Sequence, residues 1–159
     1  METTITYEAT IRTTPAIRVA ALPHSGPYVS IGSTFERLMA IAAGQGLLGP
    51  EARTFGVYYD DPASTPVSAL RADACLTLPE GCAPVGDLQL REIRGGRYAV
   101  VQHVGPYAEL ERPYKWLYGT WLAQSGEEPD NAPIVEEYLN DARTVPASEL
   151  KTAIWLPLR

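Results

Sequence analysis

The sequence has 159 residues, of which 45% are hydrophobic and 20% are charged. This size and balance are typical of one compact globular domain or of two very small fused ones, and they exclude a disordered tail. Thirteen Lys and Arg against nineteen Asp and Glu give a formal net charge of −6, so we expect no basic surface for direct binding to nucleic acid.

The first half of the chain predicts two strands, a helix and two more strands, in that order. Alternating or continuous runs of apolar and β-branched residues indicate strands at 5–12, 16–23, 55–59 and 70–78. Between the second and third of these strands, apolar and small residues recur at helical spacing and predict one face of an amphipathic helix: Thr34, Leu38, Ile41 and Ala42.

The second half predicts the same series of elements. The expected strands are 88–93, 97–103, 134–139 and 152–158. The Gly95-Gly96 pair predicts a hairpin turn between the first two of them. The helix is indicated by side chains at three- and four-residue spacing: Leu110, Tyr114, Leu117, Tyr118, Trp121 and Leu122.

An internal repeat explains why the halves look alike. A His-x-Gly-Pro-Tyr motif occurs at 24–28 and again at 103–107. Further matches follow in the same order, with Tyr59-Asp60-Asp61 corresponding to Tyr138-Leu139-Asn140-Asp141, and 66–71 corresponding to 146–151. We therefore expect a single domain over 1–159 that contains one unit at about 5–79, a linker at 80–87 and a second unit at about 88–158.

Short turns between neighbouring strands favour antiparallel pairing, and only two helices are available to cover the strands. The sequence thus predicts an α+β fold, with one curved antiparallel sheet of about eight strands and two helices on one face. The seam between the copies is a natural place for a small-molecule cleft.

Metal, cofactor and membrane sites are not expected. Cys75 and Cys82 are read as reduced thiols, and His24 and His103 supply at most two metal ligands. Because the His-x-Gly-Pro-Tyr motif occurs in both copies, we interpret it as a turn-shaping element rather than a catalytic one. The N-terminus has neither a positively charged nor an apolar leader segment, and the apolar runs are short, which favours a cytoplasmic protein without membrane contact.

An ordered series of short motifs resembles the GyrI-like small-molecule-binding family, which includes DNA gyrase inhibitor proteins and the effector-binding domains of AraC-type and MerR-type multidrug regulators. The resemblance covers about residues 5–158. The motifs are Phe55-Gly56-Val57-Tyr58-Tyr59-Asp60-Asp61-Pro62, Thr65-Pro66, Leu70-Arg71-Ala72-Asp73-Ala74-Cys75, Gly95-Gly96-Arg97-Tyr98-Ala99-Val100 and Pro133-Ile134-Val135-Glu136-Glu137-Tyr138-Leu139-Asn140.

This resemblance implies a duplicated strand-helix-strand-strand fold with an aromatic ligand cleft between the copies. In such relatives the cleft often accepts lipophilic cations, and one buried glutamate is the charge partner. By motif, that glutamate corresponds to Glu136. The regulators also carry a helix-turn-helix domain, for which this chain has no room, so we do not expect direct transcriptional control.

Strand alternation places Glu136 on one face with Ile134 and Tyr138, and places Glu137 on the other face. Only one of the two glutamates can therefore face the cleft. A carboxylate in an apolar, aromatic site is costly unless it meets a cation or becomes protonated, which makes Glu136 a functional candidate. The alternative is that Glu136 is a solvated strand residue.

Aromatic residues form the second candidate set, as a ligand cage or as ordinary core. The set contains Tyr58, Tyr59, Trp116, Tyr118, Trp121, Tyr138 and Trp155. Trp116 and Trp121 point about 140° apart on a helix. We favour Trp121 as the cleft residue, because it shares a face with Tyr114, Leu117 and Tyr118.

Three functions remain open. The first is a stand-alone protein that binds lipophilic aromatic or cationic compounds and protects against them. The second is a metal-free hydrolase of cyclopropane-containing electrophiles, because Tyr118-Gly119-Thr120-Trp121 resembles a pattern of hydrolytic GyrI-like proteins; Glu136 would act with Tyr118 or Tyr138. The third is a protein that binds gyrase or another protein partner. The sequence leaves the oligomeric state open.

Overall fold

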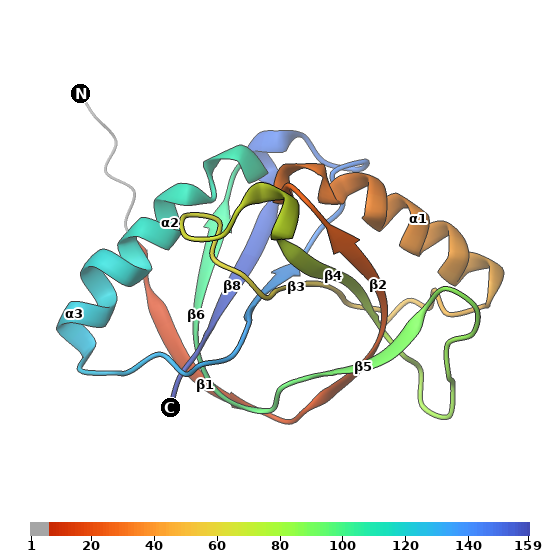
Figure 1. The fold of residues 1–159 in the computed structure, drawn as a ribbon, viewed down its shortest axis with the longest axis horizontal. Helices are drawn as coiled ribbons and strands as arrows, with labels where there is room; N and C mark the ends of the chain where they lie inside the picture. Colours follow the sequence, from red (N-terminus) through yellow and green to blue (C-terminus); the bar gives the residue numbers. More distant parts are fainter. Residues whose placement is uncertain (1–6) are drawn as a thin grey trace.

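The computed structural model describes residues 7–159, so Ile5 at the start of the first predicted strand lies outside the described residues. Within this range, eight strands form one antiparallel sheet in the order β1-β6-β8-β7-β3-β4-β2-β5 (Figure 1). The strands are β1 (Ala9–Thr14), β2 (Ile17–Ser25), β3 (Thr54–Tyr58), β4 (Arg71–Thr77), β5 (Gln89–Ile93), β6 (Gly96–Val104), β7 (Ile134–Tyr138) and β8 (Lys151–Pro157). The predicted α+β fold is confirmed.

Two helical segments cover one face of the curled sheet, as predicted (Figure 1). The first is α1 (Ile31–Gly44), which buries Thr34, Leu38 and Ala42. The second runs through α2 (Glu111–Trp116), a π-helical turn at Leu117–Trp121 and α3 (Leu122–Ser125), and it ends at Gly126 with a left-handed φ of 73°. Each helix belongs to one of the two sequence copies.

The predicted hairpin at Gly95-Gly96 is wrong. β5 pairs with β2, whereas β6 pairs with β1, so the strands on either side of these glycines lie in different parts of the sheet. Chain segment 94–95 instead passes close to the connection between β1 and β2, where a Cβ on Gly95 would lie 2.6 Å from the backbone nitrogen of Ala16. The glycine pair therefore permits two connections to pass each other, and each leading strand completes the sheet of the other copy.

The core has two sides, separated by the sheet. On the helix side, one cluster gathers around Leu38 of α1 and another around Leu117 of the second helix. On the opposite side, the curl of the sheet encloses an aromatic cluster around Phe55, Tyr98 and Trp155. Within residues 7–159, no helix is both long and apolar enough to cross a membrane.

Candidate functional site

Glu136 lies at the centre of the sheet, where the two copies meet. It belongs to β7, which pairs with β3 in the register Gly56↔Glu136. Its side chain faces the helices, because Tyr114 of α2 donates a hydrogen bond to its Oε2. The predicted alternation is therefore correct, and Glu136 is only 7% exposed.

Glu137 has the same burial but a different environment. It is 8% exposed and faces the opposite side of the sheet. There it accepts two hydrogen bonds from Arg53, from Nε to Oε2 at 2.8 Å and from Nη2 to Oε1 at 3.0 Å. Among residues 7–159, Glu136 has no such cationic partner. Two adjacent buried carboxylates are thus stabilised in different ways, one by an arginine and the other by phenols.

Glu136 lies within a hydrogen-bonded chain that contains three tyrosines. Besides Tyr114, Tyr138 donates to Oε1 at 2.8 Å, and the Tyr58 and Tyr138 hydroxyls are 2.5 Å apart. Burial raises the pKa of Glu136 above its usual value, while the hydrogen bonds from the tyrosines oppose this increase. Burial and the nearby carboxylate also raise the pKa of Tyr114 and of Tyr138 far above the usual phenol value, so these phenols remain donors.

Gly56 makes room for this chain of phenols. A Cβ at this position would lie 2.8 Å from the ring and hydroxyl of Tyr58 and 2.9 Å from the hydroxyl of Tyr138. These distances are shorter than a van der Waals contact, so a side chain would displace both rings. The first copy therefore has a glycine where the second copy has the carboxylate of Glu136.

Aromatic rings from both copies surround the tyrosine chain. Tyr28 packs edge-on against Tyr58 at 4.9 Å between ring centroids, and Phe35 and Tyr107 pack against Tyr138 at 5.3 and 5.7 Å. We did not predict Tyr28, Phe35, Tyr107 or Tyr114 as site residues. Their signal was the repeat itself, because Tyr28 and Tyr107 end the shared His-x-Gly-Pro-Tyr motif, and Phe35 and Tyr114 occupy equivalent helix positions.

The predicted site residues do not all gather at Glu136. Tyr58 and Tyr138 do, and they end their strands in equivalent positions. Tyr138 therefore corresponds to Tyr58 rather than to Tyr59, and that part of the predicted alignment is wrong. Tyr59 lies on the opposite side of the sheet, where its hydroxyl donates to Asp73.

The remaining predicted aromatics are not part of this hydrogen-bonded chain. Tyr118 is 47% exposed and forms no hydrogen bond to Glu136. Trp116 packs against Tyr7 at 5.7 Å, and Trp121 is half-buried in the same hydrophobic cluster. Trp155 lies on the opposite side of the sheet, against Phe55 and Tyr98.

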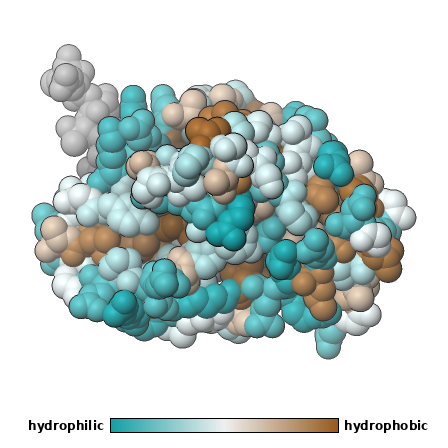
Figure 2. All heavy atoms as spheres, viewed as in Figure 1, coloured by the Kyte–Doolittle hydropathy of each residue, from teal (hydrophilic) through white to brown (hydrophobic). Residues whose placement is uncertain are grey.

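The site is closed in this structure. Both carboxylate oxygens of Glu136 are covered by phenols, and a cavity of about 470 Å³ lies instead on the opposite face of the sheet. Viewed with the helices uppermost, the exposed hydrophobic residues form separate patches among polar ones (Figure 2). A ligand that reaches Glu136 must therefore displace aromatic side chains.

The histidines and cysteines form no metal site among residues 7–159, where no group of three potential metal ligands occurs. His24 donates from Nε2 to the Pro27 carbonyl at 2.9 Å, and its Nδ1 is hydrogen-bonded to the Thr34 hydroxyl at 2.8 Å. His103 makes a longer bond, 3.4 Å, to the Pro106 carbonyl. Both imidazoles thus bind the carbonyl of the proline in their own loop, which agrees with a turn-shaping role. Cys75 and Cys82 are free thiols.

The chemistry available at Glu136 follows from this geometry. A buried carboxylate that faces only phenols and aromatic rings can pair with an organic cation, whose charge also interacts with the ring faces. With its pKa raised by burial, it can also accept a proton from water.

Comparisons with known proteins agree with this description. Residues 7–159 match the family described as GyrI-like small molecule binding domain. The chain is 34% identical to the probable transcriptional regulator YgiV of Escherichia coli strain K12, over 98% of this chain and 99% of the relative. It is 33% identical to a DNA gyrase inhibitor of Edwardsiella piscicida, over 87% of this chain and 90% of the relative. The crystal structure of the EcmrR C-terminal domain superposes with a TM-score of 0.83 at 20% identity, covering 98% of this chain and 99% of that one.

Proposed function

The chain belongs to the GyrI-like small-molecule-binding family, and we propose that it is a stand-alone binding protein for lipophilic aromatic or cationic compounds, with a role in protection against them. The observation that supports this proposal is the environment of Glu136. Its carboxylate is buried at the centre of the domain, is surrounded by aromatic rings and has no cationic partner among residues 7–159. A lipophilic cation would supply that partner.

The energetic argument compares the closed and the occupied site. In the closed site, phenol hydrogen bonds stabilise the carboxylate, but burial still raises its pKa. An organic cation adds direct charge pairing, and each contact with a Tyr or Phe face adds about 0.5 to 2 kcal/mol. The hydrogen bond from Tyr114 is the one that a ligand would most readily replace, because Tyr114 comes from the helix rather than from the sheet.

The helix that carries Tyr114 also has an irregular backbone segment, at which the helix could bend when the site opens. The π-helical turn begins at Leu117 and includes Gly119. A Cβ added to Gly119 would meet no atom within 4 Å, so this part of the helix has free space around it. Interrupted helices of this kind are frequent at functional sites. We expect Tyr114, and with it the exposed Tyr118, to move when a ligand enters.

A titration with tetraphenylphosphonium, a lipophilic monocation, tests the proposal. Tryptophan fluorescence should change saturably, since Trp116 and Trp121 lie on the helix that moves. Glu136→Gln keeps the shape of the side chain but removes its charge, so it should weaken binding about tenfold or more. Glu137→Gln is the matched control, because that carboxylate has the same burial on the other face of the same strand. Equal affinity of the wild-type protein and Glu136→Gln would refute the proposal.

Metal-free hydrolysis is a second candidate, favoured by the hydrogen bonds between Glu136 and the tyrosines. The carboxylate would take a proton from water while the water oxygen attacks a ring carbon of an activated cyclopropane. The ring C–C bond to that carbon would break, and its electron pair would move onto the conjugated carbonyl, to whose oxygen a phenol would donate a hydrogen bond. Chromatography of a cyclopropane-bearing electrophile after incubation distinguishes the candidates. Ring-opened product in excess over protein, lost in Glu136→Gln, would establish turnover.

A gyrase partner is the third candidate. It is favoured by the relatives named DNA gyrase inhibitor, to one of which this chain is 33% identical. A supercoiling assay with purified gyrase tests it directly, and inhibition by both the wild-type protein and Glu136→Gln would separate this activity from ligand binding.

A further inference from the structure

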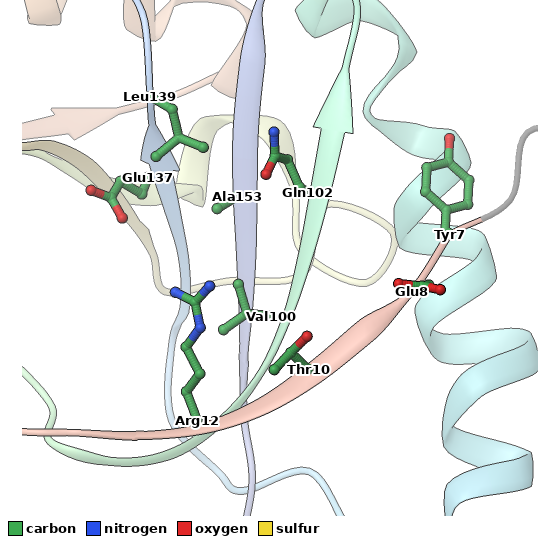
Figure 3. Close-up of a pocket in the computed structure, with 9 residues that line it drawn as sticks. All are labelled: Tyr7, Glu8, Thr10, Arg12, Val100, Gln102, Glu137, Leu139 and Ala153. Atoms are coloured by element: carbon green, nitrogen blue, oxygen red, sulfur yellow. The ribbon is translucent and has the colours of Figure 1, made fainter.

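The cavity on the opposite face of the sheet lies where β6, β7 and β8 of the second copy are joined by β1 of the first. It has a volume of about 470 Å³ and lies over β1, β6, β8 and β7 (Figure 3). Val100 and Ala153 form an apolar floor, and Gln102, Thr10 and Arg12 add polar groups at its sides. A volume of this size is within the range of small-molecule sites.

The first copy shows what fills the equivalent space there. Asp73 of β4 is 3% exposed on this face of the sheet. Its Oδ2 lies 3.1 Å from Nε of Arg91 and accepts a hydrogen bond from the Tyr59 hydroxyl at 2.5 Å. An internal carboxylate therefore neutralises the arginine of the edge strand β5, which lies on the far side of β2.

The strand register identifies Arg12 as the counterpart of Arg91. Arg91 of β5 lies opposite Val19 of β2, and Arg12 of β1 lies opposite Tyr98 of β6. Val19 and Tyr98 precede the histidines of the two His-x-Gly-Pro-Tyr motifs by the same number of residues. Arg12 and Arg91 therefore occupy equivalent positions on the two edge strands, β1 and β5.

The partners of the two arginines differ. Alignment of Leu70-Arg71 with Leu150-Lys151 places Ala153 at the position of Asp73 and Leu139 at the position of Tyr59. The second copy therefore lacks both the carboxylate and the phenol that occur beside Arg91. Among residues 7–159, the guanidinium of Arg12 has no ion-pair or hydrogen-bond partner, and it points towards the cavity (Figure 3).

We propose that this cavity binds a small organic carboxylate. Its carboxylate group occupies the position in the second copy that corresponds to the Asp73 side chain in the first, and it pairs with Arg12. A guanidinium binds a carboxylate through two parallel hydrogen bonds, which fixes the orientation of the ligand. The apolar part of the ligand lies on Val100 and Ala153, within reach of the Gln102 amide.

The acidic residues at the cavity do not neutralise Arg12. Glu137 is already paired with Arg53 through two hydrogen bonds. Glu8 lies on the same face of β1 as Arg12 but beyond Thr10, towards the other end of the cavity. The site is thus distinct from Glu136 in position and in the charge of its ligand, since one accepts an anion and the other a cation.

The test is an NMR titration of the ¹⁵N-labelled protein with benzoate, and with benzamide as its neutral isostere. Benzoate should shift the amide signals of β1, β6 and β8 saturably, and benzamide should bind about tenfold or more weakly. Arg12→Gln should remove this preference for the anion. Arg143→Gln is the matched control, because that arginine is exposed and pairs locally with Asp141.

Ala153→Asp provides a second, independent variant. It places a carboxylate beside Arg12, as Asp73 is placed beside Arg91. The variant should therefore no longer bind benzoate, while its NMR spectrum remains that of a folded protein. Glu136→Gln should leave benzoate binding unchanged, which separates this proposal from the cation site. Equal binding of benzoate and benzamide, unchanged affinity in Arg12→Gln, or shifts confined to the helices would each overturn the proposal.

Discussion

Glu136 lies directly opposite Gly56 in the pairing of β7 with β3. Because these strands come from the two copies, a duplication would place two equivalent side chains together at this point. One copy instead has the carboxylate, and the other has no side chain at all. This difference leaves one buried carboxyl group at the junction and gives the tyrosine rings the space to reach it.

The first prediction concerns the pH dependence of stability. Burial raises the folded-state pKa of Glu136 above the unfolded value of 4.5, so the folded protein holds this proton more tightly than the unfolded chain. The stability from this group is fully present below the unfolded pKa and is lost as the pH rises through the raised folded pKa. Glu136→Gln has no titratable group at this position, so its stability should not show this loss.

Urea unfolding at about pH 4 and about pH 7 checks this prediction. The free energy of unfolding of Glu136→Gln, minus that of the wild-type protein, should be larger at the higher pH than at the lower one. The same difference in unfolding free energy at both pH values would contradict the raised pKa.

The second prediction compares two tyrosines. Tyr138→Phe removes the donor to Glu136 and leaves the Tyr58 hydroxyl without its 2.5 Å partner, so it should lower the free energy of unfolding by about 1 to 3 kcal/mol. Tyr118→Phe removes an exposed hydroxyl and should change stability by less than about 0.5 kcal/mol. Thermal unfolding of both variants is sufficient, and equal destabilisation would show that Tyr118 contributes to the closed site.

The third prediction concerns Gly56. Gly56→Ala introduces a Cβ at 2.8 Å from the Tyr58 ring, which should cost about 1 to 3 kcal/mol of stability by overpacking and should disturb ligand binding. Gly32→Ala is the control, since its Cβ would meet nothing within 4 Å and it lies in α1. A helical alanine should stabilise the protein by up to about 1 kcal/mol. If both variants behave alike, Gly56 does not shape the site.

Alternation and repetition predicted the strands, the helices and the face of Glu136, because these depend on local spacing. The same signals could not identify the pairing of the leading strands. A Gly-Gly pair permits a hairpin, but it equally permits a close crossing, and the choice depends on contacts between segments 15–16 and 94–95. For the same reason Trp155 could not be assigned from its residue type. Its face is set by the register of β8, which turns it towards Phe55 and Tyr98.

The crossing at Gly95 gives the fourth prediction. A Cβ on Gly95 would lie 2.6 Å from the backbone nitrogen of Ala16 and 3.1 Å from the carbonyl carbon of Pro15. Backbone atoms cannot move aside as a flexible side chain would, so Gly95→Ala should destabilise the protein by about 1 to 3 kcal/mol. Gly49→Ala, at a loop position with no atom within 4 Å of the added Cβ, is the control.

Urea unfolding of both variants measures the difference, and hydrogen exchange locates it. Loss of protection should appear in β1 and β5 together, because the two connections that cross at Gly95 fix both edge strands. In a simple hairpin, the loss would appear in β5 and β6 and would leave β1 unaffected. That result, or a fully stable Gly95→Ala variant, would contradict the crossing.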